Sequence, residues 1–525
     1  MEAHAHDKDR RMLHALGYAQ ELSRRMSGFS NFAISFTIIS ILSGTLTLYY
    51  AGINYGGPIE EAYGWPLVSV FVVIVGLGMA EIASRYPTAG GLYYWSSKMG
   101  GPAWGWFTGW FNLIGQIAIT AGIDYGAALF ADALLQLLWP GTFKGTAHEV
   151  IYVYAVILAV HALMNIFSVR LVAFLNDVSV WWHVLGVLII VAFLIFKPSH
   201  HQSFSTVFGH TLNNSGWGHG WLWLVLLLGL LQAQYTYTGY DASAHMSEET
   251  QNASRSAARG VIMSIVVSAV FGYILALGVT FAIQGSIGGT AAAGTFAVKK
   301  VYLDALGNTT AKVMLFITVM AQLYCGMSSI TSASRMMYAF SRDGAVPGHS
   351  LWRRLNRERV PYLSAIAIAV LAFLAAFPAY FGTSGYTAYI AVTSIATIGL
   401  YIAYALPIFL RLRLGDAWEP GEWNLGRHYR WIGSVACLWV LFISILFILP
   451  TGPNGVPWHT AKFKWTLFNY APVAVLGTLA LVGGWWLVSA RNWFKGPIPQ
   501  GSEEELARIE AQYGEPVAGA APSSA

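Results

Sequence analysis

Two short runs of hydroxyl-bearing residues, each with a glycine, lie inside otherwise apolar stretches of the chain. They are the run Ile39–Thr47, which contains Ser43-Gly44-Thr45, and the run Gln234–Asp241, which contains Tyr237-Thr238-Gly239-Tyr240. A glycine there can interrupt a membrane helix, and backbone groups that lose their partners must then line a cavity or meet a ligand. A free helix N-terminus attracts a carboxylate, whereas free carbonyls attract an ammonium. The two runs therefore predict a site for a zwitterion, with close packing of helices at the two glycines as the alternative.

A polar stripe lies in the third apolar stretch, and its members recur at every fourth residue: Asn112, Gln116, Thr120 and Asp124. In a helix they share one face about 120° wide, and a charged group in a membrane helix is a candidate functional residue. We expect Gln116 to border the substrate path and Asp124 to attract an amine. The alternatives are that the stripe forms only interhelical hydrogen bonds, or that Asp124 lies at the outer mouth. Asp241 is expected to cap the half-helix that follows it.

Charged residues near the expected inner mouth form two candidate gates. Glu81 and Arg85 are one helical turn apart, a spacing that allows an ion pair. Glu248 and Arg255 face each other across a short segment. We expect each pair to close the inner mouth. A solvated loop is the alternative, because exposed ion pairs contribute little to stability.

The elements that must position these residues are membrane helices. The chain has 525 residues, of which 56% are hydrophobic and only 10% charged, whereas a soluble globular domain carries about 25% charged residues. This composition excludes a soluble enzyme, a disordered chain and a disulfide scaffold. The apolar runs are continuous, which excludes a membrane β-barrel with its alternating segments. The composition therefore indicates an all-α integral membrane protein.

Twelve stretches satisfy the requirement that a membrane-crossing helix contain about 20 mostly apolar residues. They lie near 30–54, 65–85, 104–135, 149–167, 175–196, 221–246, 258–284, 311–338, 361–381, 386–411, 430–450 and 467–489. We expect a single transmembrane domain over 30–493 between a polar N-terminal tail, 1–29, and a C-terminal tail, 494–525. No cleavable signal peptide is expected, because the first residues are polar.

The distribution of Lys and Arg predicts the orientation of the chain, since inner loops of membrane proteins are enriched in both. With the N-terminus inside, every arginine and all but seven of the 30 Lys and Arg fall on the inner side. The strongest marker is the segment from Arg335 to Arg359, which holds six arginines. We therefore expect a multi-pass protein of the plasma membrane with both termini in the cytoplasm.

Several motifs resemble those of the amino acid–polyamine–organocation (APC) permeases. Leu42-Ser43-Gly44-Thr45 is similar to the glycine motif of their first helix, except that Thr45 stands where Ile is usual. The run that begins at Tyr237 and continues to Glu248-Glu249-Thr250 resembles their sixth helix. Further matches are the ends of the second and eighth spans and a segment typical of the amino acid/choline branch: Ala80–Gly91, Ser332–Gly344 and Phe29–Phe36.

This resemblance implies a LeuT-like fold with 12 transmembrane helices, in which spans 1–5 and 6–10 form two inverted repeats and two helices are added. It implies that the substrate carboxylate binds around Ser43, Gly44 and Thr45, and the amine around the carbonyls of Tyr237 to Tyr240. In APC relatives a lysine of the fifth span can stand near the first broken helix, and His183 occupies the aligned position. His183 is therefore the candidate proton-coupling group, with a neutral histidine bonded to a neighbouring helix as the alternative.

The predicted function is secondary active transport of GABA or a neutral amino acid by alternating access, with protons or exchange as the coupling mode. A choline or polyamine carrier of the same fold is the alternative, since Tyr235, Tyr237, Tyr240 and Asp124 offer aromatic faces and an acid. A sensor with the fold of a transporter is a further alternative. No enzyme activity, cofactor, metal site or nucleic-acid partner is expected, because P-loop, metal-ligand and nucleophile motifs are missing from the sequence. The expected partners are the small-molecule substrate, the bilayer and protons.

Overall fold

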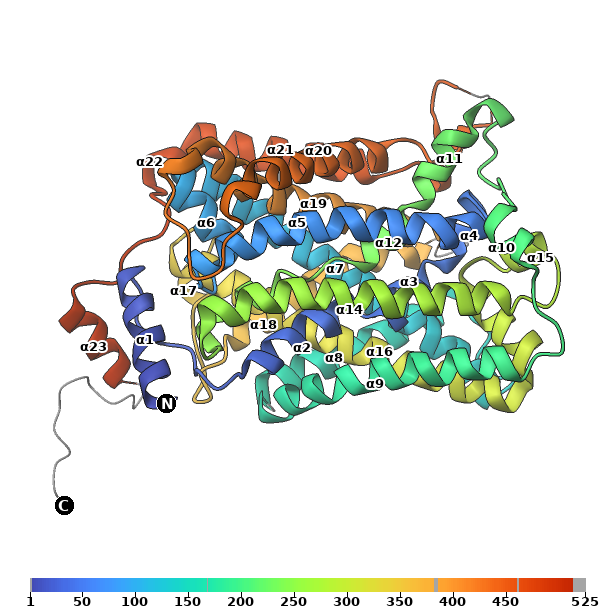
Figure 1. Cartoon of the computed structure of the whole chain (residues 1–525), viewed down its shortest axis with the longest axis horizontal. Coiled ribbons are helices and arrows are strands. Elements are labelled where there is room, and N and C mark those ends of the chain that lie inside the picture. The colour runs from blue at the N-terminus through green and yellow to red at the C-terminus, as the bar shows by residue number, and fades with distance from the viewer. Residues whose placement is uncertain (1, 168, 382–385, 460–461, 513–525) are drawn as a thin grey trace, which may run out of the picture.

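The computed structural model describes residues 2–167, 169–381, 386–459 and 462–512. In these parts the chain forms an elongated bundle whose long helices run side by side (Figure 1). Among the described residues, eleven helices are long and apolar enough to cross a membrane. The predicted all-α membrane class is confirmed, whereas eleven rather than twelve stretches reach the length of a membrane span.

Ten long helices form most of the bundle. Four precede residue 200: α5 (Trp65–Arg85), α7 (Pro102–Leu138), α8 (Ala147–Phe167) and α9 (Val169–Phe196). Six follow it: α14 (Ala253–Phe281), α16 (Ala297–Arg342), α18 (Tyr362–Ala376), α19 (Tyr386–Leu414), α20 (Tyr429–Ile448) and α21 (Ala471–Trp485).

The first apolar stretch is broken at Ser40, between α2 (Gly28–Ile39) and α3 (Ile41–Thr47), and continues as α4 (Tyr49–Tyr55). Ser40 has φ 41° and ψ 80°, a left-handed conformation that interrupts the helix. The break thus lies inside the run Ile39–Thr47, as predicted, but at Ser40 and not at Gly44, which is helical. A Cβ on Gly44 would lie 2.8 Å from the Cα of Thr236, so this glycine allows two backbones to approach closely, which was the alternative.

The second break lies where it was predicted. The sixth stretch consists of α11 (Leu222–Gly229), α12 (Leu231–Thr236) and α13 (Ala242–His245), and residues 237–241 between the last two are not helical. Gly239 has φ +101°, and a Cβ there would lie 2.2 Å from Cγ2 of Ile38. No helix of this sixth stretch reaches the length of a membrane span. The stretch is therefore not among the eleven membrane-crossing helices.

The two breaks therefore face each other in the middle of the bundle. Gly239 contacts the end of α2 at Ile38, and Gly44 of α3 contacts α12 at Thr236. The helix α7 packs against both α16 and α19 beside them. The predicted functional residues are consequently held by the most deeply buried part of the fold.

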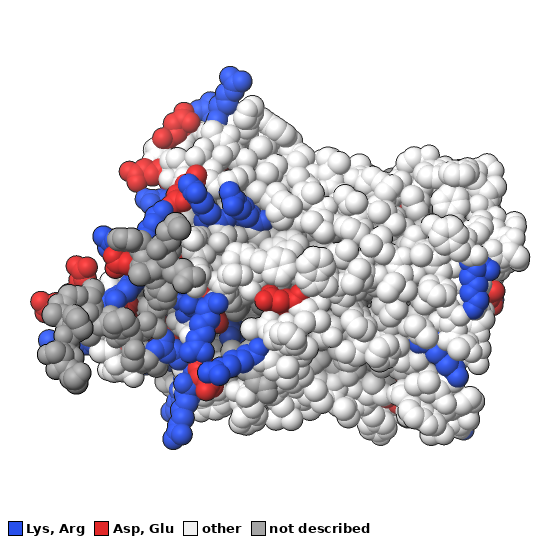
Figure 2. Space-filling view, turned by 60° about the horizontal axis from the view of Figure 1, so that its bottom comes forward, with Lys and Arg blue, Asp and Glu red and all other residues white. Residues whose placement is uncertain are grey.

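The two terminal segments lie together at one end of the bundle (Figure 1). They contain α1 (Glu2–Ala15) and α23 (Glu503–Ala511). Lys and Arg gather at the same end, whereas the middle of the surface in this view is nearly free of charge (Figure 2). The bundle thus has one strongly charged end, called the tail end below, and one weakly charged end.

Candidate functional site

Asp241 is the centre of the polar contacts at the second break. Its fully buried carboxylate accepts hydrogen bonds from the Gln116 amide at 2.8 Å, the Tyr404 hydroxyl at 2.8 Å and the Asn112 amide at 3.2 Å. Nε2 of His245 lies 3.3 Å from the same carboxylate. The expected capping role of Asp241 is wrong: it occupies the N-cap position of α13, but its side chain forms no capping bond.

The predicted polar stripe of α7 faces the interior as expected, but its members bind different partners. Asn112 and Gln116 both donate to Asp241, so the structure places the Gln116 amide in a bond with the protein. The Thr120 hydroxyl lies 2.7 Å from that of Ser329 on α16. These contacts match the alternative of interhelical hydrogen bonds for this part of the stripe.

Asp124 pairs with a histidine that the sequence did not single out. His161 on α8 places Nδ1 3.2 Å from Oδ1 of Asp124, and both side chains are buried. A Cβ on Gly326 of α16 would lie 1.7 Å from the same oxygen, so the missing side chain makes room for the carboxylate. The adjacent Cys325 donates to the carbonyl of Ile38 at 3.1 Å. The pair therefore borders the first break, and a histidine in an apolar stretch was the signal available for it.

His183 contacts the first break directly. Its Nδ1 lies 2.8 Å from the Ser179 carbonyl, an acceptor that requires Nδ1–H as the donor. Nε2 lies 2.7 Å from the hydroxyl of Ser40 and therefore accepts from it. The fully buried imidazole thus sits as a neutral ring against the residue at which the helix breaks.

The free backbone donors of α3 lie just before the residues predicted to bind a carboxylate. The N–H groups of Ser43 and Gly44 both donate to the Ser40 carbonyl, at 2.8 and 2.9 Å. The first N–H groups of a helix have no intrahelical acceptor, and in α3 these belong to Ile41 and Leu42. The free donors consequently lie just before Ser43, and Thr45 lies a turn further into the helix.

The predicted amine site has free acceptors. Among the described residues, the carbonyls of Tyr237 and Thr238 accept no hydrogen bond. The Tyr240 carbonyl accepts from the Ser35 hydroxyl at 2.9 Å. The Tyr237 hydroxyl bonds that of Ser69, so its ring turns away from the break. Two carbonyls at the second break are thus available to a donor.

The residues predicted as gates form ion pairs, but with other partners. Glu81 is 1% exposed and lies 3.2 Å from Arg411 of α19 instead of pairing with Arg85. The reason is that Glu81 faces the core, while the Arg85 side chain is 39% exposed and pairs with Glu419. The expected Glu81–Arg85 pair is therefore wrong.

The expected Glu248–Arg255 pair is also wrong. Glu248 is fully buried and binds Arg342 at the end of α16, with 3.0 Å between Oε1 and Nη2. Arg255 points to the surface, where its side chain is 64% exposed and pairs with Glu422. Next to Glu248, the Glu249 carboxylate lies 2.8 Å from Arg335. The segment after the second break is thus tied to α16 by two arginines.

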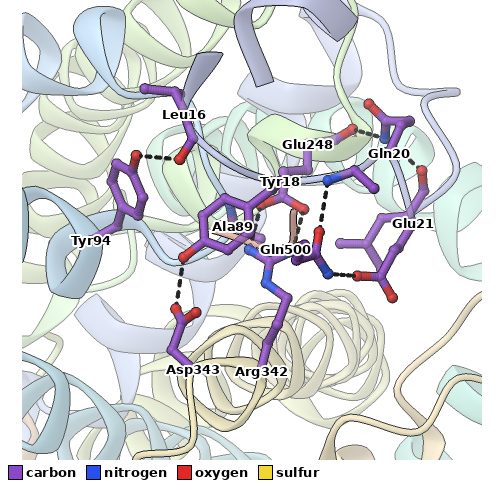
Figure 3. Close-up of polar contacts among 12 residues, drawn as sticks. Leu16, Tyr18, Gln20, Glu21, Ala89, Tyr94, Glu248, Arg342, Asp343 and Gln500 are labelled. Carbon is purple, nitrogen blue, oxygen red and sulfur yellow. Dashed lines mark hydrogen bonds and ion pairs between the residues drawn. The ribbon is translucent and has the colours of Figure 1, made fainter. Parts of the chain in front are cut away.

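The N-terminal segment covers Arg342, the first of these arginines (Figure 3). The Tyr18 ring lies against the Arg342 guanidinium at 3.8 Å, and its hydroxyl donates to Asp343 at 2.8 Å. The Gln20 amide donates to the Glu248 carbonyl at 2.9 Å. Burial raises the pKa of Asp343, although the neighbouring Arg342 opposes the shift. The tail end is therefore sealed in this structure.

A cavity of about 380 Å³ lies beside the sealed region. Its lining includes Ile34 of α2, Asp177 of α9, and the Glu249–Arg335 pair. A second cavity, of about 470 Å³, lies at the opposite end, and Asn54 of α4 is part of its lining. The two breaks lie between these ends of the bundle.

Residues 26–480 match the family model described as amino acid permease. The amino-acid permease BAT1 of Arabidopsis thaliana is 42% identical over 503 residues, which cover 93% of this chain and 95% of that protein. A BAT1 homolog from rice is 41% identical, with 93% and 95% covered. The GABA-specific permease of Saccharomyces cerevisiae is 28% identical over 95% of this chain and 87% of its own length.

Proposed function

The chain belongs to the amino acid permease family, and from that premise we propose that it carries GABA or a neutral amino acid across the plasma membrane by alternating access. As a member of this family it is a multi-pass amino acid transporter and not an enzyme. The substrate, the coupling and the gates are the parts that we propose.

The observation that carries the proposal is the pairing of the two breaks. The unsatisfied N–H groups at the start of α3 suit a carboxylate, and the free carbonyls of Tyr237 and Thr238 suit an ammonium. Gly239 against Ile38 holds the two backbones together. A small amino acid carries both charges on one short skeleton and matches this arrangement. Ser43, Gly44, Thr45 and Tyr240 flank the site rather than supplying its free backbone groups.

The coupling group in this proposal is His183. A proton on Nε2 would convert that nitrogen from acceptor to donor, so the bond from the Ser40 hydroxyl would have to reverse. Ser40 is the point at which the first helix breaks. Protonation at His183 would therefore act on the backbone that holds the substrate.

The tail end is the cytoplasmic end in this proposal, because it carries most of the Lys and Arg (Figure 2). The buried pairs Glu248–Arg342 and Glu81–Arg411 act as the inner gate. Arg85 and Arg255 contribute exposed pairs at its rim.

Choline or a polyamine is the second candidate substrate. The rings of Tyr240, Tyr401 and Tyr404 lie within 6.3 Å of one another beside Asp241, and aromatic faces bind organic cations. Asp241 already accepts three hydrogen bonds, which leaves it less free to bind a cation than the carbonyls are.

Uptake into proteoliposomes tests the proposal, with labelled GABA, a pool of neutral amino acids, choline and putrescine assayed in parallel. Each is measured with and without an inward proton gradient. We expect saturable uptake and counterflow of GABA or an amino acid, increased by the gradient. Uptake of choline or putrescine alone would refute the zwitterion site, and binding without flux would indicate a sensor.

A further inference from the structure

Two adjacent acidic residues are buried at the weakly charged end, at the start of the second span. Glu60 and Glu61 begin a π-helical turn, Glu60–Gly64, that leads into α5. They are 7% and 1% exposed, and Oε1 of each has no hydrogen-bond partner among the described residues. No described Lys, Arg or His pairs with either carboxyl group. Two unpaired buried carboxylates are strongly unfavourable, so the site must hold something positive.

Glycines make room for the Glu60 carboxyl group. A Cβ on Gly64 would lie 2.2 Å from its Oε1, one on Gly56 2.9 Å from its Oε2, and one on Gly229 2.7 Å from its carboxyl carbon. Gly56 directly follows α4, and Gly229 is the last residue of α11. The acid is thus enclosed between the outer parts of both broken stretches, without a polar partner for Oε1.

Glu61 is joined to both broken stretches by one amide. Nε2 of Gln232, on α12, donates to Oε2 of Glu61 at 3.0 Å and to the Thr45 carbonyl of α3 at 3.2 Å. These two acceptors fix the orientation of the amide, so its Oε1 needs a donor. A Cβ on Gly52 would lie 2.0 Å from Gln232 Oε1 and 2.8 Å from Glu61 Oε1. Two buried acceptors without a donor therefore converge on the same point.

A proton on Oε1 of Glu61 satisfies both atoms. A carboxylic acid and a primary amide then exchange two hydrogen bonds, one from the amide N–H to the acid and one from the acid O–H to the amide oxygen. We propose that Glu61 is a proton-binding site, open to exchange with the outer solution, that couples the proton to the junction of the two broken helices. This inference rests on the proposed function for its role in transport, and on the contacts above for the proton itself.

The titratable groups on the elements packed around the pair do not supply another donor. The Tyr49 hydroxyl of α4 is bonded to Thr280, at 2.9 Å. The Tyr273 hydroxyl of α14 donates to the Ala62 carbonyl at 3.0 Å. No described hydroxyl, that of Tyr55 at the end of α4 included, donates to Oε1 of either carboxyl group. The His210 side chain after α10 (Phe204–Gly209) is exposed.

Loss of the proton would break this junction. A Glu61 carboxylate would face the Gln232 carbonyl oxygen, and a buried acceptor without a donor costs about 1–3 kcal/mol. The contact that holds Thr45 of α3 and Gln232 of α12 to the second span would weaken. A proton taken from the outer solution therefore favours the closed outer end, and its release accompanies rearrangement of the two breaks.

The test uses the full chain in proteoliposomes and the variant Glu61→Gln. The new amide can donate to Gln232 Oε1 and accept from its Nε2, so it keeps both bonds but carries no exchangeable proton. We expect counterflow to persist and the stimulation of uptake by an inward proton gradient to be lost. Asp304→Asn is the matched control, because this outer carboxylate is paired with Lys300 and 39% exposed. Full gradient stimulation in Glu61→Gln would overturn the coupling role.

Infrared spectroscopy of the purified protein at neutral pH tests the proton without substrate. We expect a carbonyl band of a buried, hydrogen-bonded carboxylic acid that Glu61→Gln removes and Asp304→Asn retains. If Glu61→Gln does not fold, Gln232→Asn must shift the band, since its shorter amide withdraws from the acid. The absence of such a band in the wild-type protein would overturn the proposal. If the wild-type protein transported no amino acid, the proposed function would fail. The infrared band would still decide whether Glu61 is protonated.

Discussion

At the tail end of the bundle, Glu81, Glu248 and Glu249 each pair with an arginine, whereas at the opposite end Glu60 and Glu61 pair with no described cation. A buried ion pair resists separation, because opening it leaves two charges in a low dielectric. A neutral acid bonded to an amide, in contrast, gains or loses its proton as the pH of the solution that reaches it changes. If Glu61 binds a proton as we propose, the two mouths of this carrier are controlled by different chemistry, fixed charges on one side and an exchangeable proton on the other.

The largest expected effect comes from removing an arginine of the tail end. Arg342→Gln leaves the fully buried Glu248 without its cation, a change that costs about 3–5 kcal/mol. We expect a large fall in the midpoint of thermal unfolding in detergent. Arg430→Gln is the control, because its partner Asp416 and the arginine itself are 77% and 68% exposed, and little change is expected there. Equal shifts for the two variants would contradict the distinction between the ends.

A smaller effect is expected from crowding the junction between the ends. Gly239→Ala must place a Cβ 2.2 Å from Ile38 at a backbone φ of +101°, and overpacking of this kind costs about 1–3 kcal/mol. We expect uptake to fall at least several-fold while the folded protein is still recovered. Gly477→Ala on α21 is the control, since nothing lies within 4 Å of its Cβ position. Normal uptake by Gly239→Ala would show that the breaks need not touch.

A change confined to coupling is expected at His183. His183→Gln retains a side chain that can bond Ser40 but cannot take up a proton near neutral pH. Counterflow should be unchanged, while accumulation driven by the proton gradient should be lost. His219→Gln, in an exposed position of the outer loop, should behave as the wild type. Unchanged accumulation in His183→Gln would leave Glu61 as the coupling group of the two.

The smallest effect is expected from pH at the tails. Burial would raise the pKa of Glu510, but bonds from His14 at 2.7 Å and the Gln20 N–H at 2.9 Å, together with Arg10, lower it on balance. A carboxyl group with a lowered folded-state pKa stabilises the docked state above its usual titration range and loses that contribution as the pH falls through the folded-state value. Protection of the Glu503–Ala511 amides against hydrogen exchange, relative to the intrinsic rate at each pH, should therefore be high at neutral pH and fall only in acid. Fast exchange at neutral pH would contradict this.

Much of the fold follows from apolar length alone. Ten of the twelve expected stretches contain long helices, and the other two, the first and the sixth, were expected to be broken and are. The second break could be predicted because Gly239 adopts a backbone conformation that favours glycine. The first was predicted within Ile39–Thr47, but its position at Ser40 could not be, because Ser40 is left-handed in a setting that includes the distant His183 and its bond to the Ser40 hydroxyl.

The polar partners were harder to predict than the polar residues. Asp124, Glu81 and Glu248 were all recognised as important, but each binds a residue far away in the sequence, and spacing along a helix reveals only neighbours within one turn. Glu60 and Glu61 were missed because two acids beside a glycine-rich turn are typical of an exposed loop. Only the packing of three glycines around Glu60 shows that they are interior.

The Tyr18 segment that lies over Arg342 (Figure 3) has a consequence for the timing of the cycle. Opening the tail end requires that this segment leave, together with the C-terminal stretch that binds it through Gln500. The opposite mouth is covered by a loop instead, in which the N–H groups of Leu212 and Asn214 donate to the carbonyls of Gly56 and Asn54 at 3.1 and 2.9 Å. A carrier whose two mouths are held by different covers opens one mouth more readily than the other. Its half-saturating substrate concentration therefore differs between the two sides, although its two fluxes stay equal when the concentrations are equal.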